Sequence, residues 1–200
     1  MVATAPLAST MDLTTARLVL EPMAPQHAPL LAQFFVRNEE HLRPWDPPRP
    51  RGITDVEFWS AEAQRAVEDH AEAAVARWVL LLRGDPGRIV GRVNFTQVVR
   101  GPFQSCMLGY AIDAQCQGRG LMHEALEAAL SYAFEVMRLH RVQANHLPEN
   151  HRSARLLQRL GFRVEGLARD YLYINGAWRD HVLTALTYPG FDTRVYYAGA

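Results

Sequence analysis

A glycine-rich junction between a predicted strand and a predicted helix is the feature that most constrains this chain. The apolar run Cys106–Ile112 has the pattern of a strand, and apolar residues recur at helical spacing from Leu121 to about Leu139. Between them lies the run Gln115-Cys116-Gln117-Gly118-Arg119-Gly120. Its glycines let the backbone turn with exposed amides, and the helix that follows directs its unpaired N–H groups at the same spot. The junction therefore predicts a binding site for an anion such as a pyrophosphate.

The spacing of this junction is Gln-x-x-Gly-x-Gly. It is neither the dinucleotide-binding pattern Gly-x-Gly-x-x-Gly nor the Walker loop with its Lys-Ser/Thr. Taken alone, so short a pattern also fits an ordinary glycine-rich turn from strand to helix. The segments around it must decide between the two interpretations.

The first half of the chain predicts alternating elements that end in an antiparallel meander. A strand at 17–21 and a helix from Pro25 precede a proline-rich segment at 41–50, and a second helix is predicted from Thr54 to Ala76. Strands at 78–82, 89–95 and 106–112 follow, joined by short turns. Successive strands with short connections pair in antiparallel fashion.

The second half predicts a parallel crossover and a hairpin. A strand at 141–146 follows the long helix, so it is expected to lie parallel to the strand at 106–112. A helix at 149–160 ends at Gly161, and Asn175-Gly176 joins strands at 171–174 and 178–186. We expect an α/β (α+β) fold with a mostly antiparallel sheet of about seven strands and about four helices.

Composition restricts the class of protein. Two hundred residues that are 48% hydrophobic suit one domain, which we place at 12–188, between a flexible N-terminal segment at 1–11 and a C-terminal tail at 189–200. Basic and acidic residues number 21 each, so no bulk positive charge indicates direct nucleic-acid binding. Two cysteines without metal-ligand spacing, a poor signal peptide and no membrane-length apolar run favour a soluble, cytoplasmic protein.

Several local runs sharpen these expectations. The runs are Gly91–Phe95, Leu108–Tyr110, Gln117–Met122, Asn150–Ser153, Leu160–Phe162 and Asn175–His181. Together they resemble the GNAT N-acetyltransferase superfamily, and most closely its bacterial ribosomal-protein alanine N-acetyltransferases of the RimJ type. The resemblance is dense over 88–187. It implies a GNAT fold with a parallel strand pair splayed around the cofactor, acetyl-coenzyme A (acetyl-CoA) as cosubstrate, and the N-terminal α-amine of a ribosomal protein as acceptor.

The same resemblance implies where the cosubstrate binds. The pyrophosphate is expected on the backbone of the glycine junction and the start of the next helix, and the pantetheine along the end of the preceding strand, where it borrows backbone hydrogen bonds as an added strand does. Asn150 then opens a helix on the thioester side. The residues implied are Tyr110, Ala111, Ile112, Gln117, Gly118, Arg119, Gly120, Leu121, Met122 and Asn150. For Arg119 two interpretations stay open: its side chain contacts a phosphate, or it is simply solvated.

The catalytic positions depart from the family pattern. Many superfamily members place a tyrosine seven residues after the equivalent of Asn150 to protonate the leaving thiolate, but this chain has Leu157 there. The resemblance to the RimL type gives that role to Ser153. The RimL type is also thought to use a glutamate base at a position that is Leu172 here. Asp46, Glu40, Asp170 and Asp180 are the acidic candidates for the base, and each is also explained as a solvated or capping residue.

The acceptor side is expected at Trp45, Asp46 and Tyr171, because the segment between the first two helices borders the acceptor site in this fold. The alternative is that Trp45 only anchors a proline-rich segment and that Tyr171 is an ordinary hairpin aromatic. Cys116 has no histidine placed to activate it, and no His-x-x-x-His pair indicates a metal, so we predict neither a covalent role nor a metal.

The sequence thus predicts acetyl transfer to an N-terminal amine by direct attack in a ternary complex. An α-amine of pKa about 8 is roughly a fifth neutral near pH 7.4, so it needs less help from a base than a lysine does. One alternative is an enzyme of the same fold that acetylates a small amine. Another is a module that binds or senses coenzyme A without turnover. We expect a monomer or homodimer with no membrane partner.

Overall fold

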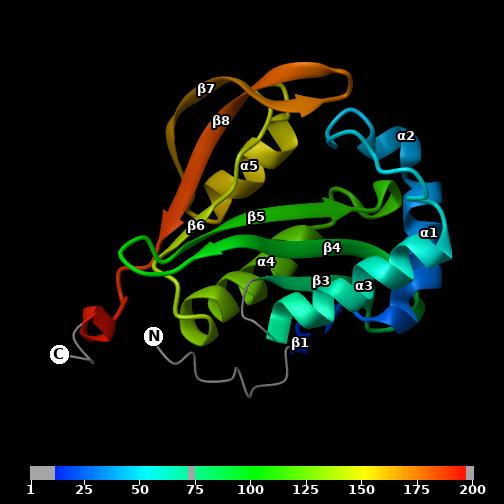
Figure 1. The fold of residues 1–200 in the computed structure, drawn as a ribbon, viewed down its shortest axis with the longest axis horizontal. Helices are drawn as coiled ribbons and strands as arrows, with labels where there is room; N and C mark the ends of the chain where they lie inside the picture. The colour runs from blue at the N-terminus through cyan, green and yellow to red at the C-terminus, as the bar shows by residue number, and fades with distance from the viewer. Residues whose placement is uncertain (1–11, 72–74, 197–200) are drawn as a thin grey trace.

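The strands of this chain form one mixed sheet in a computed structural model that describes residues 12–71 and 75–196 (Figure 1). The order across the sheet is β1-β2-β3-β4-β5-β6-β8-β7, and every neighbouring pair is antiparallel except β5 and β6. The strands are β1 (Leu13–Thr14), β2 (Leu18–Pro22), β3 (Ala76–Leu82), β4 (Asp85–Val99), β5 (Ser105–Ile112), β6 (Arg141–Gln143), β7 (Arg163–Ile174) and β8 (Ala177–Thr187).

The helices cover both faces of this sheet. Helices α1 and α3 pack on one face, and α4 packs on the other, each over its own cluster of buried side chains (Figure 1). Short 3-10 turns lie at Pro25–His27, Ala114–Cys116 and Thr193–Tyr196, and a π-helical turn at Tyr132–Val136 extends α4. The α-helices are α1 (Ala28–Arg37), α2 (Glu39–Leu42), α3 (Val56–Ala71), α4 (Leu121–Ser131) and α5 (His151–Arg159).

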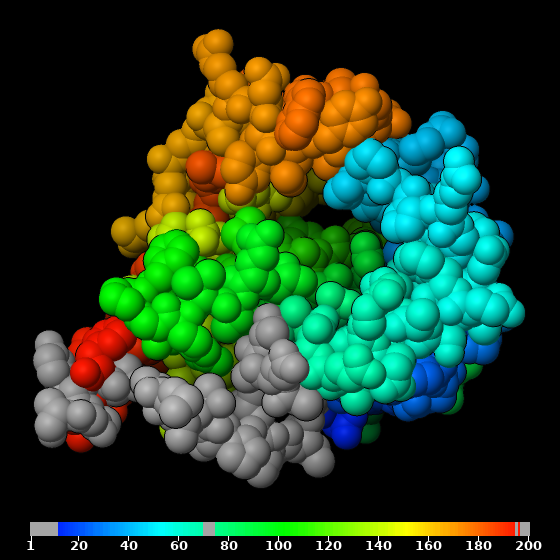
Figure 2. Space-filling view, viewed as in Figure 1, coloured from blue at the N-terminus to red at the C-terminus, as the bar shows by residue number. Residues whose placement is uncertain are grey.

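The molecule is hollowed where three segments meet (Figure 2). The β7–β8 hairpin, drawn in orange, lies across from the cyan segment that follows α2, and the green strands β4 and β5 lie between them. None of the helices in the described part of the chain is long and apolar enough to cross a membrane.

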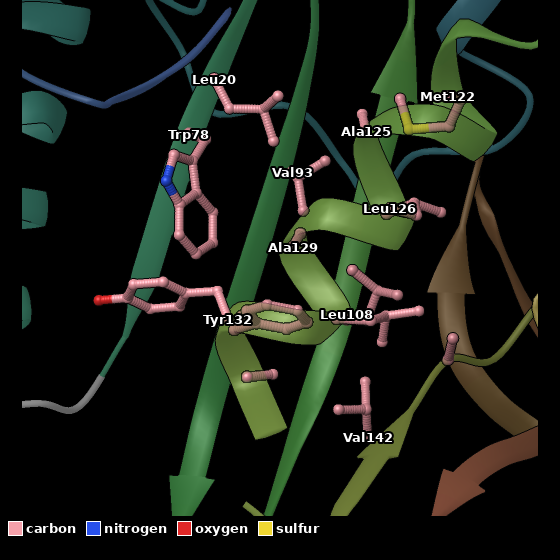
Figure 3. Close-up of a cluster of buried hydrophobic side chains, with 14 of the residues drawn as sticks. Leu20, Trp78, Val93, Leu108, Met122, Ala125, Leu126, Ala129, Tyr132 and Val142 are labelled. Carbon is pink, nitrogen blue, oxygen red and sulfur yellow. The ribbon is translucent and has the colours of Figure 1, made fainter. Parts of the chain in front are cut away.

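Helix α4 anchors the core on its face of the sheet (Figure 3). Its buried side chains recur every three or four residues, which is the spacing of one helical face, and Leu126 and Ala129 are fully buried. Trp78 of β3 packs edge-on against Tyr132, with ring centroids 5.2 Å apart, and against Phe95 at 5.8 Å. Truncating a buried leucine such as Leu126 to alanine is expected to cost about 2–5 kcal/mol. This packing fixes the start of α4 relative to β5.

The two parallel strands stay together for only a short distance. Strand β5 pairs with β6 from Ser105 to Met107, and among the described residues it then pairs only with β4 as far as Ile112. Strand β6 turns instead towards β8, and His146 makes an isolated bridge with Val182. The backbone of β5 beyond Met107 is therefore open on the side that faces away from β4.

Gly91 allows β4 to approach β5 at this level. A Cβ on Gly91 would lie 2.7 Å from the Ala111 carbonyl oxygen and 2.9 Å from a methyl group of Leu80. Such contacts are too short for any side chain, and the register of β3 and β4 shifts next to this point. The glycine thus sets the geometry beneath the open part of β5.

The structure confirms the mixed, mostly antiparallel sheet, the antiparallel meander β3–β4–β5, the parallel pair β5–β6 and the hairpin at Asn175-Gly176. The described residues contain eight strands, whereas about seven are predicted; the additional strand, β1, is only two residues long. The helix predicted to reach Ala76 ends its described part at Ala71, and Ala76 instead pairs with Phe95 as the first residue of β3. Strand pairing overrides the helix propensity of alanine there.

Candidate active site

The glycine loop, which we define as residues 115–120, turns tightly into α4. Gly118 and Gly120 have φ values of 71° and 75°, a conformation that costs other residues about 1–2 kcal/mol. Gly120 caps α4, and its carbonyl accepts the Glu124 N–H. The Arg17 guanidinium donates to the Arg119 carbonyl at 2.8 Å and pairs with the Glu124 carboxylate at 2.7 Å. The loop is therefore fixed before any ligand binds.

The predicted phosphate-binding backbone continues into the first turn of α4. Leu121 and Met122 begin this helix, and first-turn N–H groups have no acceptor within their own helix. At the other end of the loop, the Gln117 side chain contacts His41 Nε2 of α2 at 3.0 Å and accepts a hydrogen bond from Arg152 of α5. The glycine loop thus joins two helices that are far apart in sequence.

Two hydroxyl groups meet beside the open part of β5. Tyr110 Oη and Ser153 Oγ are 2.6 Å apart, within hydrogen-bond distance. Burial raises the pKa of Tyr110 to about 12, although the bond to Ser153 acts in the opposite direction. The tyrosine therefore keeps its proton at neutral pH. Asn150 positions Ser153, since its side-chain oxygen accepts the Ser153 N–H at 3.1 Å at the start of α5. Leu157 is buried in the core, with 1% of its surface exposed.

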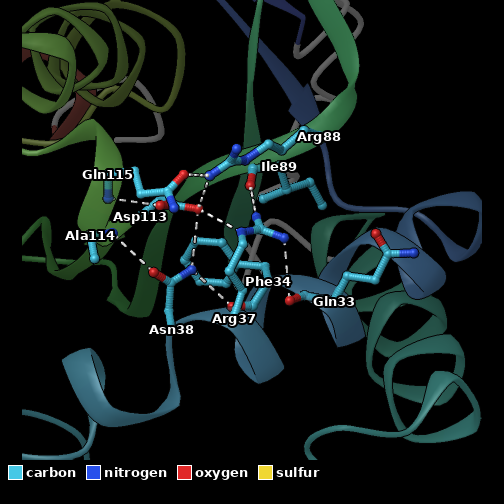
Figure 4. A network of polar contacts seen from close by, with 9 residues as sticks. All are labelled: Gln33, Phe34, Arg37, Asn38, Arg88, Ile89, Asp113, Ala114 and Gln115. Atoms are coloured by element: carbon cyan, nitrogen blue, oxygen red, sulfur yellow. Dashed lines mark hydrogen bonds and ion pairs between the residues drawn. The ribbon is translucent and has the colours of Figure 1, made fainter.

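A buried carboxylate secures the link between β5 and the glycine loop (Figure 4). Asp113 has no exposed surface and accepts hydrogen bonds from Arg37 at 2.8 Å, Arg88 at 3.0 Å and Asn38 at 3.4 Å. It also accepts the Gln115 N–H at 2.9 Å. Burial by itself would raise the pKa of Asp113, but the bonds from Arg37 and Arg88 lower it to about 2. The carboxylate is therefore charged at neutral pH.

Asn38 completes this network from the end of α1. Its side-chain oxygen accepts the Ala114 N–H at 2.9 Å, and its amide donates to the Phe34 carbonyl at 2.9 Å. The side chain is almost fully buried. The end of α1 and the entry to the glycine loop therefore form one hydrogen-bonded unit, which no sequence motif had indicated.

A cavity of about 380 Å³ lies on the opposite face of the sheet, under α1 and α3. Asp46 and Arg49 line it from the proline-rich segment, and Arg92, Asn94 and Thr96 line it from β4. Asp46 pairs with Arg49 at 3.5 Å. Burial raises the pKa of Asp46, although Arg92 and Arg49 act in the opposite direction. The structure thus places one predicted acceptor residue in a partly open cavity, beside charged side chains from β4.

The four acidic candidates for the base differ in their surroundings. The Glu40 side chain is 77% exposed and pairs with Arg43 at 2.7 Å. Asp180 accepts the Asp170 N–H at 2.9 Å, next to a register shift in the β7–β8 hairpin. Of the four, Asp46 is the one that lines the cavity. Since it is already paired with Arg49, it is better placed to position a substrate than to accept a proton.

The two predicted aromatic residues belong to the segments on either side of the hollow. Trp45 follows α2 and is 38% exposed, with its backbone N–H donating to the Leu42 carbonyl. Tyr171 of β7 is 37% exposed, and its hydroxyl accepts a hydrogen bond from Asn145 at 3.2 Å. Both are available to a ligand that enters the hollow, and neither lines the cavity beside β4.

The cysteines and the histidines have structural explanations. Cys106 and Cys116 are free and buried, and burial raises the pKa of Cys106 to about 12. Within residues 12–71 and 75–196, no group of three or more His, Cys, Asp or Glu side chains is arranged to hold a metal ion. His146 and His181 are buried beside β8, each with a ring nitrogen next to a backbone carbonyl oxygen.

Comparison with known proteins agrees with this geometry. The acetyltransferase (GNAT) domain model matches residues 17–163. The chain is 45% identical over 177 residues to the [ribosomal protein uS5]-alanine N-acetyltransferase of Escherichia coli (strain K12), which covers 88% of this chain and 91% of that protein.

Two solved structures have the same fold. The ribosomal-protein-S5-alanine acetyltransferase of Vibrio fischeri superposes with a TM-score of 0.86 at 33% identity, over 91% of this chain and 99% of that one. RimJ of Mycobacterium smegmatis, in complex with CoA-disulfide, gives 0.84 at 28% identity, over 92% and 90%. The predicted family is confirmed, and the chain belongs to the GNAT acetyltransferases.

Proposed function

We propose that this protein transfers the acetyl group of acetyl-CoA to the N-terminal α-amine of a ribosomal protein, with an alanine N-terminus like that of uS5 as the leading acceptor. The observation that supports this most is the 45% identity to the uS5-alanine enzyme along nearly the whole of both chains. The protein would act in the cytoplasm as a monomer or homodimer, without binding nucleic acid directly.

The donor half of the reaction fits the open part of β5. The glycine loop and the first turn of α4 offer amides and a positive helix end to a pyrophosphate. Beyond Met107, β5 has backbone groups that a pantetheine can use as an added strand would. Tyr110 and Asn150 then lie on the thioester side of the same opening.

The chemistry requires one bond to form and one to break. The neutral amine attacks the thioester carbonyl, the new C–N bond forms, and the C–S bond breaks with the electron pair remaining on sulfur. The attack makes the nitrogen positively charged, and it then gives up a proton to water. Because roughly a fifth of an α-amine is already neutral near pH 7.4, the attack does not need a strong base. Ser153, hydrogen-bonded to Tyr110, supplies the proton for the thiolate and regains one from water, which has taken up the proton of the amine.

Thiol release from acetyl-CoA tests this proposal directly. The assay compares a peptide with the uS5 N-terminus against other ribosomal N-terminal peptides and a set of small amines, and mass spectrometry locates the acetyl group. We expect turnover on a peptide that begins with alanine and acetylation at its α-nitrogen. Turnover on small amines alone would contradict the proposal, and so would tight binding of acetyl-CoA without turnover on any amine.

A further inference from the structure

Arg92 is a buried guanidinium without a counter-charge in contact. It projects from β4 into the cavity beside that strand, and its Nε atom is fully buried. Its guanidinium carbon lies 4.9 Å from the centre of the Phe35 ring, which holds it by a cation–π contact. Among the described residues, no side-chain hydrogen bond or ion pair is made by Arg92. Burial lowers its pKa, yet an arginine stays protonated in proteins.

Two other polar atoms at the same cavity also lack partners within the described part of the chain. They are Arg49 Nε and Asn94 Oδ1, and both are fully buried. Buried polar groups in native proteins are nearly always hydrogen-bonded, so three orphaned atoms on one cavity indicate a ligand that supplies their partners. The three residues that carry these atoms line the cavity, and they bring two guanidinium groups and one amide to its wall.

The charges around the cavity leave one cation in excess. Its two carboxylates already have partners, since Asp46 pairs with Arg49 at 3.5 Å and Glu62 pairs with Arg77 at 3.8 Å. Three lining arginines, Arg49, Arg77 and Arg92, thus face two carboxylates, and Arg92 and Arg49 share the charge of Asp46. A carboxylate fits a guanidinium better than a neutral group does, because it accepts two parallel hydrogen bonds.

The cavity lies within reach of a polypeptide whose N-terminus is at the open part of β5. Asn94 and Arg92 pair across the sheet with Gly109 and Ala111 of β5. Two strand spacings of about 4.8 Å separate β4 from the opening, and an extended chain advances about 3.3 Å per residue. Gly109 is exposed, and a Cβ there would meet no atom within 4 Å. No side chain at this position therefore blocks the path from the open part of β5 to the cavity.

We infer that this cavity binds an acidic side chain of the acceptor polypeptide, an aspartate or glutamate within about four residues of the acetylated amine. Arg92 pairs with the carboxylate, and Asn94 and Arg49 bind the neighbouring backbone amide and carbonyl. This inference rests on the proposed function and adds the sequence that the enzyme selects. It assigns specificity to a pair of residues, Arg92 and Asn94, on a strand that takes no part in the chemistry.

The test uses short peptides that begin with alanine and carry one glutamate at the second, third or fourth position, each matched by a glutamine peptide. We expect kcat/KM at one position to be about tenfold higher for glutamate, through KM rather than kcat. Arg92→Gln should bring that ratio close to one, and Arg92→Lys should retain part of it. Arg163→Gln, which removes the same charge from an exposed site at the start of β7, should leave it unchanged.

One further readout, together with the pattern of turnover, separates the possible failures. In the wild-type protein the preference for glutamate should fall as salt rises from about 0.05 to about 0.5 M, which requires no variant to fold. Equal turnover of the glutamate and glutamine peptides at every position would overturn this inference and leave the proposed function intact. No turnover on any peptide would overturn both.

Discussion

The two halves of the site are built in different ways. The donor side consists of one continuous stretch, β5 through the first turn of α4, together with the start of α5, and much of what it offers is backbone. The acceptor side gathers side chains from the proline-rich segment, α3, β3 and β4 around one cavity. A backbone site is specified by local sequence, whereas a site of assembled side chains is specified by the whole fold. Substitutions should therefore act differently on the two halves.

The largest effect is expected from the one donor-side position where a side chain carries the chemistry. Ser153→Ala should lower kcat about a hundredfold, because the thiolate then leaves without a nearby proton donor. Steady-state kinetics with acetyl-CoA measures this, and Ser131→Ala, an exposed serine at the end of α4, is the control. A larger loss in Tyr110→Phe than in Ser153→Ala would instead make Tyr110 the proton donor.

Asp113 tests how much its buried network, which connects α1 to the glycine loop, stabilises the fold. Its pKa in the folded protein is about 2, below the ordinary 3.8, so its charge contributes stability above about pH 4 that is lost as the pH falls towards 2. Asp113→Asn should lower the free energy of unfolding by about 2 kcal/mol at pH 7.

Urea denaturation between pH 7 and about pH 2 checks this, and the gap between variant and wild type should close at the acid end. Asp12→Asn removes an exposed carboxylate and should change little. A gap that persists unchanged down to about pH 2 would show that the charge of Asp113 is not what stabilises the network.

The glycine loop tests whether the donor side depends on backbone shape alone. Gly118→Ala should raise KM for acetyl-CoA about tenfold, since the alanine opposes the positive φ and perturbs the loop amides. Gly101→Ala is a matched control, because Gly101 has φ of 70° and the same free space around a Cβ, in the turn between β4 and β5. Both variants should lose similar stability, and an equal rise in KM in both would refute a local role for Gly118.

The smallest effect is expected at Asp46, whose charge influences how strongly the acceptor side prefers an acidic peptide. Asp46→Asn should increase the preference for an acidic peptide about threefold, because it removes the negative charge nearest to Arg92 and Arg49. Since burial raises the pKa of Asp46, the wild-type preference should also grow as the pH is lowered. Competition between glutamate and glutamine peptides measures it, and a preference that falls in the variant would contradict this assignment.

The contrast between the donor side and the acceptor side also explains which features the sequence could predict. The helical spacing of α4, the parallel crossover and the turn at Asn175-Gly176, whose φ values are 46° and 86°, all depend on neighbours in the chain. Strand β7 begins at Arg163 rather than near Tyr171, because register shifts on either side of its middle interrupt the alternating pattern. Local periodicity cannot detect a strand whose pairing is irregular.

The residues that sequence reasoning missed in the site are those that depend on distant partners. Arg92 and Asn94 stand out in the sequence only as part of a family run, since alternate polar residues on a strand are ordinary. Nothing near them in the chain shows that Asp46 and Arg49 will lie opposite. Asp113 is similar, because its arginine partners come from α1 and the start of β4. A long-range ion pair leaves no periodic signal.

The early separation of β5 and β6 has a consequence for which molecules can pair with this sheet. An unpaired edge on the rim of a sheet recruits strands from other proteins and promotes aggregation. Here the unpaired edge begins after Met107, in the interior of the sheet, with β6, β8 and β7 beyond it. A further polypeptide strand would have to fit between β5 and other strands of the same sheet, whereas a thin, flexible tether needs less room. The sheet thus selects its partners by width before any side chain recognises them.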